Sequence, residues 1–177
     1  MSNFSVPTRE QVSENNQAIF DNLQKAVGFV PNIYAAMAHS KNALGSYLQF
    51  SGSETSLTKK EKEVVDLAVS QLNGCRYCQS AHTAIGKMNG FTDEQILELR
   101  KGNASWDNKT SVLAQTARSI ADKRGQVSES EVEAFYAVGY TKENLVDLIV
   151  AIGIITVTNL FHNVTNVAID FPVAPEL

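Results

Sequence analysis

Two cysteines and a histidine in this chain stand at a spacing that suits thiol chemistry. The only cysteines are Cys75 and Cys78, and His82 follows the second of them by four residues. If this stretch is helical, the three side chains share one face of the helix. Two cysteines so placed can close a disulfide with little backbone movement, and a nearby imidazole can exchange a proton with a thiol. The pattern predicts a thiol-redox site.

Two arguments from the sequence point to different cysteines as the one that reacts first. The attacking form is a thiolate, and free cysteine has a pKa of about 8.5. A helix that begins near Cys75 would place partial positive charge there and favour its thiolate. Proximity to His82 favours Cys78 instead. We expect Cys78 to attack, because a base within reach also assists proton delivery to the leaving group.

Glu63 precedes Cys75 by twelve residues and is a candidate third member of the site. The pair Asn73-Gly74 is a strong helix breaker, so the chain can turn back there and pack the preceding helix beside the cysteine helix. A carboxylate at that place would orient His82 or relay its proton. Beside Lys62, Glu63 also fits an ordinary solvent-exposed helix face.

Other uses of the cysteine pair have weaker support in the sequence. Structural zinc takes about four ligands, whereas Cys75, Cys78 and His82 supply three. A c-type haem site needs a histidine directly after the second cysteine, where this chain has Gln79. Two reduced cysteines in a hydrophobic core are a further interpretation. We expect no metal and no cofactor.

Helical periodicity and helix caps recur along almost the whole chain. No segment alternates with period two, so we expect an all-α fold without a sheet. The caps and breakers place helices at about 8–28, 31–37, 40–50, 58–72, 75–89, 92–102, 108–124, 128–139 and from 141 to shortly before Pro172. The prolines predict an extended C-terminal tail.

Two helix starts resemble each other. Residues 90–96 read GFTDEQI and residues 139–145 read GYTKENL. Good helix starts share such a pattern, with a glycine stop, an aromatic residue and a threonine cap. The alternative is an internal duplication of a helical unit, in which the second copy lost the cysteines.

The last helix has apolar residues around much of its circumference, among them Leu148, Ile149 and Val157. Such a helix must be buried on several sides. A homo-oligomer would bury it more easily than a single chain. We also expect Tyr34, Tyr47 and Phe50 to belong to the core.

Composition is that of one ordinary globular domain over 1–177, with a redox core at about 55–105. The 177 residues are 44% hydrophobic and 19% charged, with a net charge of −4. Nucleic acid is not expected as a partner, because phosphate binding needs clustered lysine and arginine. A secreted disulfide scaffold would carry more cysteines.

The sequence favours a cytoplasmic protein that does not enter a membrane. The first residues lack the basic and apolar stretches of a secretory signal. The longest apolar run, 148–157, is about half of the roughly 20 residues that a membrane span needs. We therefore expect this run to be part of a buried helix.

Around the cysteines the chain resembles the AhpD-like alkylhydroperoxidase branch of the carboxymuconolactone decarboxylase superfamily. The signature of that branch is Glu, eleven residues, Cys, two residues, Cys, three residues, His. Here it reads Glu63, Cys75, Cys78 and His82. A looser likeness extends over nearly the whole chain. One position departs from the best-known members, which have a second histidine where this chain has Tyr77.

The resemblance implies an all-helical, oligomeric protein, commonly a trimer or hexamer, with a peroxidase or disulfide-reductase cycle that uses no metal, haem or flavin. It implies that Cys75 and Cys78 are the redox pair, His82 the proton-transfer residue and Glu63 its relay partner. Tyr77 cannot replace a histidine that titrates near neutrality, but it can donate a hydrogen bond.

The resulting hypothesis is a thiol-dependent peroxidase with an antioxidant role. Its partners would be a hydroperoxide substrate and a dithiol reductant, either a small molecule or a protein. One alternative is lactone decarboxylation, as elsewhere in the superfamily, although that chemistry has no evident use for a thiol pair. Another is a non-enzymatic oligomer in which the cysteine pair is a redox switch.

Overall fold

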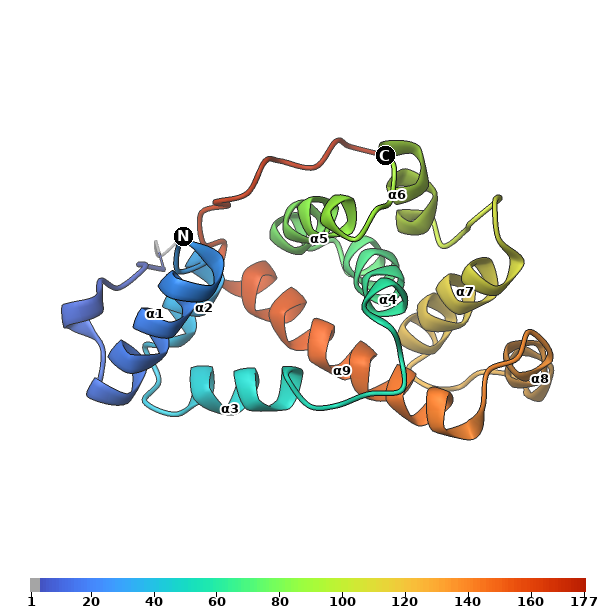
Figure 1. The fold of residues 1–177 in the computed structure, drawn as a ribbon, viewed down its shortest axis with the longest axis horizontal. Helices are drawn as coiled ribbons and strands as arrows, with labels where there is room; N and C mark the ends of the chain where they lie inside the picture. Colours follow the sequence, from blue (N-terminus) through green and yellow to red (C-terminus); the bar gives the residue numbers. More distant parts are fainter. Residues whose placement is uncertain (1–3) are drawn as a thin grey trace.

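The computed structural model describes residues 4–177, which form helices and no strand. Figure 1 shows the helices in chain order: η1 (Arg9–Gln11), α1 (Glu14–Val27), α2 (Asn32–Met37), α3 (Ala43–Ser51), α4 (Lys59–Leu72), α5 (Arg76–Met88), α6 (Asp93–Arg100), α7 (Asn108–Asp122), α8 (Glu129–Ala137) and α9 (Lys142–Thr165). The predicted all-α fold is confirmed.

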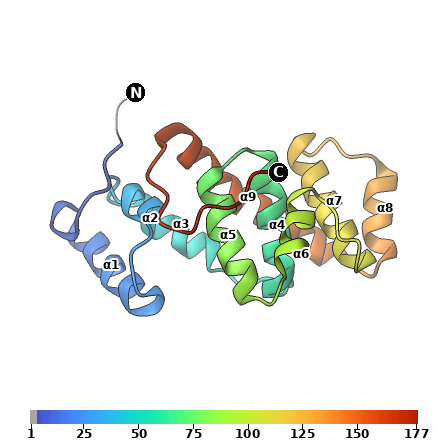
Figure 2. The same cartoon turned by 90° about the horizontal axis from the view of Figure 1, so that it is seen from above.

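Helix α4 lies at the centre of the molecule and packs against α5, α6, α7 and α9. Its apolar positions recur on more than one side of the helix, and Val64, Val65 and Leu67 are almost completely buried. Figures 1 and 2 show α1 and α2 at one end of the molecule and α7 and α8 at the other, with α9 running beneath α4 and α5 in Figure 1. The candidate site residues therefore lie on the two central helices.

The turn between α4 and α5 forms where the sequence predicted it. Asn73 ends α4, and Gly74 follows with φ of 68°, in the left-handed region that glycine adopts without a steric penalty. Cys75 is then the N-cap of α5, and its sulfur accepts a hydrogen bond from the backbone N–H of Cys78. This turn brings α4 and α5 side by side.

The predicted helix caps are mostly confirmed. Capping boxes begin four of the α-helices, at Thr58, Thr92, Ser128 and Thr141. Thr92 and Thr141 are the caps of the two similar sequence segments, and both accept a hydrogen bond from the backbone N–H three residues later. That shared geometry accounts for the likeness of these segments without requiring a duplicated unit.

The first and last helices are shorter than the sequence predicted. Thr8 and Gln11 do form a capping box, but it opens only the short η1, because Val12 is extended, and α1 begins at Glu14. At the other end, α9 stops at Thr165, because Asn166 takes a left-handed conformation with φ of 50°. Asparagine tolerates this region better than most residues.

After α9 the chain forms an extended tail that crosses α5 and ends beside α6 (Figures 1 and 2). Its backbone is bound at two points to α5: Arg76 donates to the carbonyl of Ala174 at 2.8 Å, and the N–H of Ala174 donates to Ser80 Oγ at 3.0 Å. The fully buried Arg100 donates to the carbonyl of Pro175 at 2.8 Å. The tail is thus a fixed part of the fold.

Within one chain, α9 is buried on one side only. Leu148, Ile152 and Ile155 are buried, whereas Ile149 and Val157 are about half exposed. By length and composition α9 is long and apolar enough to cross a membrane, with a mean hydropathy of 1.9 over an 18-residue window that is 39% buried. The sequence predicted that α9 is buried on several sides, and in the single chain it is not.

Candidate active site

Cys75 and Cys78 are joined as a disulfide at the start of α5, with their Cα atoms 5.3 Å apart. Cys75 is completely buried and is not among the residues that line the neighbouring cavity. Cys78 is also buried from bulk solvent, but its side chain lines that cavity. The two cysteines therefore differ in access, and only Cys78 can meet a molecule in the cavity without a change of structure.

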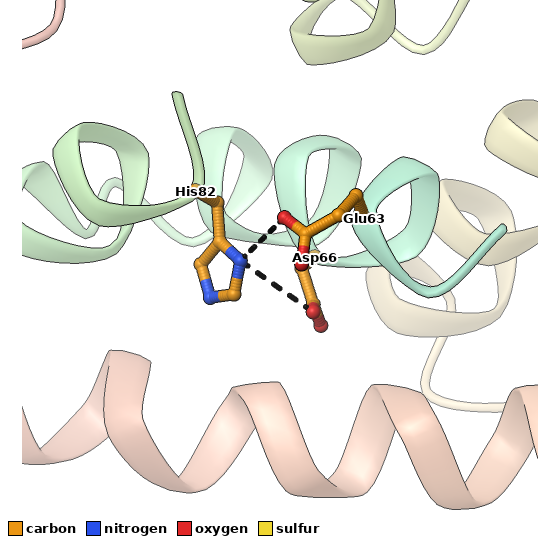
Figure 3. Close-up of side chains that lie close together, drawn as sticks. All are labelled: Glu63, Asp66 and His82. Atoms are coloured by element: carbon orange, nitrogen blue, oxygen red, sulfur yellow. Dashed lines mark hydrogen bonds and ion pairs between the residues drawn. The ribbon is translucent and has the colours of Figure 1, made fainter. Parts of the chain in front are cut away.

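His82 and Glu63, which lie 19 residues apart in sequence, meet across the α4–α5 contact. Nδ1 of His82 lies 2.9 Å from Oε2 of Glu63. The two side chains are 18% and 9% exposed, so water screens this pair weakly. In Figure 3 the other ring nitrogen points away from the carboxylates. An imidazole held through Nδ1 presents Nε2 for proton exchange, the arrangement found where a carboxylate orients a catalytic histidine.

A second carboxylate, Asp66, belongs to the same cluster. Its Oδ2 lies 3.5 Å from Nδ1 of His82, and its side chain is 14% exposed. Both carboxylates approach the same ring nitrogen from α4 (Figure 3). Asp66 was not among the sequence-predicted site residues. A signal was present, since Asp66 is the single charged residue within an otherwise apolar run, VVDLAV.

The cluster changes the charge state of its members. Burial lowers the pKa of His82, but the carboxylates of Asp66 and Glu63 outweigh this and raise the pKa to about 9. Burial raises the pKa of Asp66 to about 7, aided by Glu63 and opposed by the positive charge of His82. The carboxylates therefore favour the protonated form of His82, and burial favours the neutral form of Asp66.

A cavity of about 610 Å³ opens beside the cluster. It reaches from the end of α1 across α3, α4 and α5 to α9, and its wall is mainly apolar. The lining residues include Val27, Phe29, Ile33, Ile85, Met88, Ile154, Ile155 and Phe171. Its polar lining includes Lys62, Asp66 and His82, together with Tyr34 and Tyr47. This volume lies within the range of small-molecule sites, roughly 300–1,000 Å³.

The prediction that Phe50 belongs to the core is wrong, because its side chain is 46% exposed. Tyr34 and Tyr47 pack against the core as predicted, but each also has a second role. Their rings lie 6.0 Å apart and both line the cavity. The aromatic side chains suggested a packed core, and periodicity does not distinguish a core face from a cavity wall. These tyrosines form the wall on the side of α2 and α3.

Tyr77 donates a hydrogen bond, but to the tail of the chain. Its hydroxyl group donates to Oδ1 of Asp170 at 2.6 Å and accepts from the backbone N–H of Ile33 at 3.3 Å. Burial, together with this bond to Asp170, raises the pKa of Tyr77. Tyr77 thus connects α5 with α2 and with the tail, and its ring contributes to the cavity wall beside Phe171.

Glu63, Asp66 and His82 are also the residues whose spacing could hold a metal ion. Each offers one ligand atom, and the three atoms lie within 4.8 Å of one another. They would give one nitrogen and two oxygens, fewer than the four ligands of structural zinc. Two of these atoms, Nδ1 of His82 and Oε2 of Glu63, are hydrogen-bonded to each other.

Comparison with known proteins gives a family match over residues 31–123, just over half of the chain, to the model described as "Carboxymuconolactone decarboxylase family". The chain is also 44% identical over 43 residues to the alkyl hydroperoxide reductase AhpD of Mycobacteroides abscessus. That stretch covers 24% of this chain and 25% of the length of that protein.

Two solved structures are similar over nearly the whole chain. One is the AhpD-core, peroxidase-related protein of Ralstonia eutropha JMP134, with a TM-score of 0.86 at 21% identity, covering 95% of this chain and 92% of that one. The other is a peroxidase-related protein of Silicibacter sp. TM1040, with a TM-score of 0.84 at 22% identity, covering 94% and 90%. At these identities the likeness is one of fold. The matched family model and the shared architecture together establish that this chain belongs to the carboxymuconolactone decarboxylase family and has its AhpD-like fold.

Proposed function

We propose that the protein is a thiol-dependent peroxidase that reduces organic hydroperoxides through a Cys75–Cys78 dithiol–disulfide cycle. The observation that carries this proposal is the shared position of Cys78 and His82 on the wall of one apolar cavity, with Cys75 directly behind. The family match supports an activity of the alkylhydroperoxidase type. The cavity wall fits a substrate with an apolar body.

In the reduced protein, the imidazolium of His82 favours the thiolate of Cys78, because an adjacent positive charge lowers the pKa of a thiol. Glu63 holds the ring through Nδ1. The thiolate attacks the hydroperoxide, the O–O bond breaks, and Cys78 becomes a sulfenic acid while the alkoxide takes a proton. The oxygen atom farther from the alkyl group stays on sulfur.

Cys75 then resolves the sulfenic acid. Its thiol attacks the sulfur of Cys78, a disulfide forms, and water leaves with the proton of the thiol. A dithiol reductant, either a small molecule or a protein, returns the protein to the reduced state by thiol–disulfide exchange and is itself oxidised. The Cα separation of 5.3 Å is within the range of ordinary disulfides, so the two steps need little backbone movement.

The decisive experiment follows consumption of cumene hydroperoxide with dihydrolipoamide as donor. We expect turnover in the natural sequence and none in Cys75→Ser or Cys78→Ser. Absence of turnover in the natural sequence, with reduced thiols verified by titration, would reject the peroxidase function. It would favour a redox switch or a different reaction on the same fold.

The order of attack is tested with the same two variants, because each then contains a single cysteine. After one equivalent of peroxide, a dimedone-type probe should label Cys78 in Cys75→Ser. Mass spectrometry should find little label on Cys75 in Cys78→Ser. The reverse distribution would make Cys75 the attacking residue.

We also propose that the protein acts as a cytoplasmic homo-oligomer, a trimer or hexamer as the family resemblance implies. The exposed side of α9 supports self-association, because Val146, Ile149, Val157, Leu160 and Val164 are between 44% and 81% exposed there. With Gly153 they follow spacings of three and four residues, which define one apolar stripe along a helix. A second copy of the chain would remove this stripe from water.

A further inference from the structure

Of the two carboxylate residues beside His82, only one lines the cavity. Glu63 is 9% exposed and is not among the cavity-lining residues. Asp66 lines the cavity together with Cys78 and His82. A molecule in the cavity would therefore be in contact with a wall that includes Asp66 and does not include Glu63.

The two carboxylates also differ in their bonding. The Nδ1–H of His82 is directed to Glu63 at 2.9 Å, and Asp66 approaches the same nitrogen only at 3.5 Å. Glu63 therefore holds the ring, while Asp66 contributes charge from a longer distance. A carboxylate that is largely out of water and lacks a short hydrogen bond is costly as an anion. Protonation removes that cost, and the protonated group becomes a hydrogen-bond donor on a residue that lines the cavity.

Charged and titratable groups approach Asp66 from several elements. Helix α4 itself supplies Lys62 and Glu63, and α5 supplies His82. Tyr34 of α2 and Tyr47 of α3 face it across the cavity, where the charge of Asp66 contributes to raising the pKa values of both phenols. From α9 the cavity receives Ile154, Ile155 and Thr158, which do not titrate. Burial, with the help of Glu63, places the pKa of Asp66 at about 7.

We propose that Asp66 is a catalytic acid of this site, giving its proton to the alkoxide that leaves when Cys78 cleaves the hydroperoxide. This inference rests on the proposed peroxidase function. In the step, a lone pair of the Cys78 thiolate forms an S–O bond and the O–O bond breaks. The released electron pair stays on the alkoxide, which takes the proton of Asp66 and leaves as an alcohol. Sulfur is oxidised by two electrons and the peroxide is reduced by two.

The proton returns when the cycle closes. Reduction of the disulfide by the dithiol donor regenerates the thiol of Cys78, and that thiol gives its proton to the carboxylate of Asp66. The thiolate and the protonated acid are then restored together. His82 is the less suitable donor for this step, because the two carboxylates beside its Nδ1 stabilise its protonated form and raise its pKa.

Two substrates that differ in their leaving group test the proposal. Cumene hydroperoxide releases a strongly basic alkoxide, which needs a proton, whereas peracetic acid releases acetate, which needs none. Prereduced protein is mixed with each substrate without a donor, and the loss of free thiols is followed in a single turnover. In Asp66→Asn the rate with cumene hydroperoxide should fall by about 10²-fold. With peracetic acid the rate should change by less than about 3-fold, because no general acid is needed.

Two further variants separate this role from a structural one. Glu63→Gln should slow both substrates to a similar extent, because it disturbs the ring that stabilises the thiolate. Asp93 is an exposed residue at the start of α6, and its carboxylate pairs with Lys87 of α5. Asp93→Asn should leave both rates unchanged. Asp66→Glu keeps a carboxyl group and should recover part of the rate with cumene hydroperoxide.

The outcomes are distinct. An equal loss with both substrates in Asp66→Asn, or no loss with either, would overturn the proposal for Asp66 while the peroxidase function stands. Failure of the natural sequence with both substrates would reject the proposed function, and the role of Asp66 with it. A pH profile of the natural sequence checks the same point without a substitution: the ratio of the rate with cumene hydroperoxide to the rate with peracetic acid should decline as the pH rises and Asp66 loses its proton. A ratio that stays level would contradict the proposal.

Discussion

The imidazole of His82 on α5 is hydrogen-bonded through Nδ1 to the carboxylate of Glu63 on α4 at 2.9 Å. This contact fixes the orientation of the ring and leaves Nε2 for the cavity. It also joins α4, which carries the acidic residues, to α5, which carries the cysteines and follows later in the sequence. The position of the ring therefore depends on the packing of α4 against α5 as much as on the motif around the cysteines.

Glu63→Gln should lower the pKa of His82 by about one unit or more, because an opposite charge within about 4–6 Å typically shifts a pKa by 1–3 units. The chain has three histidines, so an NMR titration of the imidazole signals can assign each of them. The signals of His39 and His162 serve as internal references. An unchanged titration of His82 would mean that Asp66 alone sets its charge.

Asp66→Asn should make the protein more stable at alkaline pH. The pKa of Asp66 is raised from 3.8 to about 7 on folding, so between these values the folded state holds a proton that the unfolded chain lacks. The protonated Asp66 contributes its full share of the folding stability below pH 3.8, the pKa in the unfolded chain. This contribution is lost as the pH rises through about 7, the pKa in the folded protein. At pH 8 the variant should be more stable than the natural protein by on the order of 1–2 kcal/mol.

Urea unfolding at pH 5 and at pH 8 measures this difference. Asp93→Asn, at an exposed site, should follow the natural protein at both values. His82 adds a similar dependence at higher pH: its pKa is raised from 6.5 to about 9, so its contribution is complete below 6.5 and disappears through about 9. If Asp66→Asn lost stability at pH 8, the carboxylate would be a net stabilising partner of His82.

Leu160→Lys should dissociate the proposed oligomer. Leu160 is 59% exposed in the single chain, so a lysine there disturbs no core packing but places a charge within the apolar stripe of α9. Light scattering after gel filtration should give a lower mass for this variant. Ala134→Lys, at an exposed position on α8, is the matched control and should keep the mass of the natural protein. A monomeric natural protein would reject the proposed assembly.

Tyr77→Phe should loosen the C-terminal tail. The substitution keeps the ring but removes the hydroxyl that donates to Asp170 at 2.6 Å. Hydrogen bonds to charged groups contribute about 1.5–3 kcal/mol, so the free energy of unfolding should fall by about that amount. Hydrogen exchange should increase at Ile33, whose N–H donates to the same hydroxyl. Tyr136→Phe on α8 is the control, and an equal effect there would argue against a specific tail contact.

Much of the fold could be predicted because its signals are local. Threonine and serine caps with a partner three residues later, and glycine or Asn-Gly stops, fixed most helix boundaries. For the same reason, the Asn-Gly stop placed Cys75 at the start of a helix that also carries Cys78 and His82. The contact between Glu63 and His82 was expected only on condition that the chain turns at Asn73-Gly74, which it does.

Features that depend on distant parts of the chain were missed. Asp66 belongs to the cluster because its side of α4 meets α5. Tyr34 and Tyr47 line the cavity because of the way α2 and α3 are placed. The end of α9 at Asn166 was missed because a single left-handed residue interrupts an otherwise helical composition. Periodicity reports a buried face, but it does not say whether side chains or a cavity fill the space beside it.

The bound tail sets an order in which the molecule can be completed. Arg76, Ser80 and Arg100 lie on helices that are synthesised well before their partners Ala174 and Pro175. Because a domain generally folds as a unit, these contacts form only once the tail is present. Phe171, which belongs to the same tail, is part of the cavity wall. A chain truncated before residue 171 would therefore lack part of the cavity wall and would leave Arg76 and Arg100 without the carbonyl groups to which they donate.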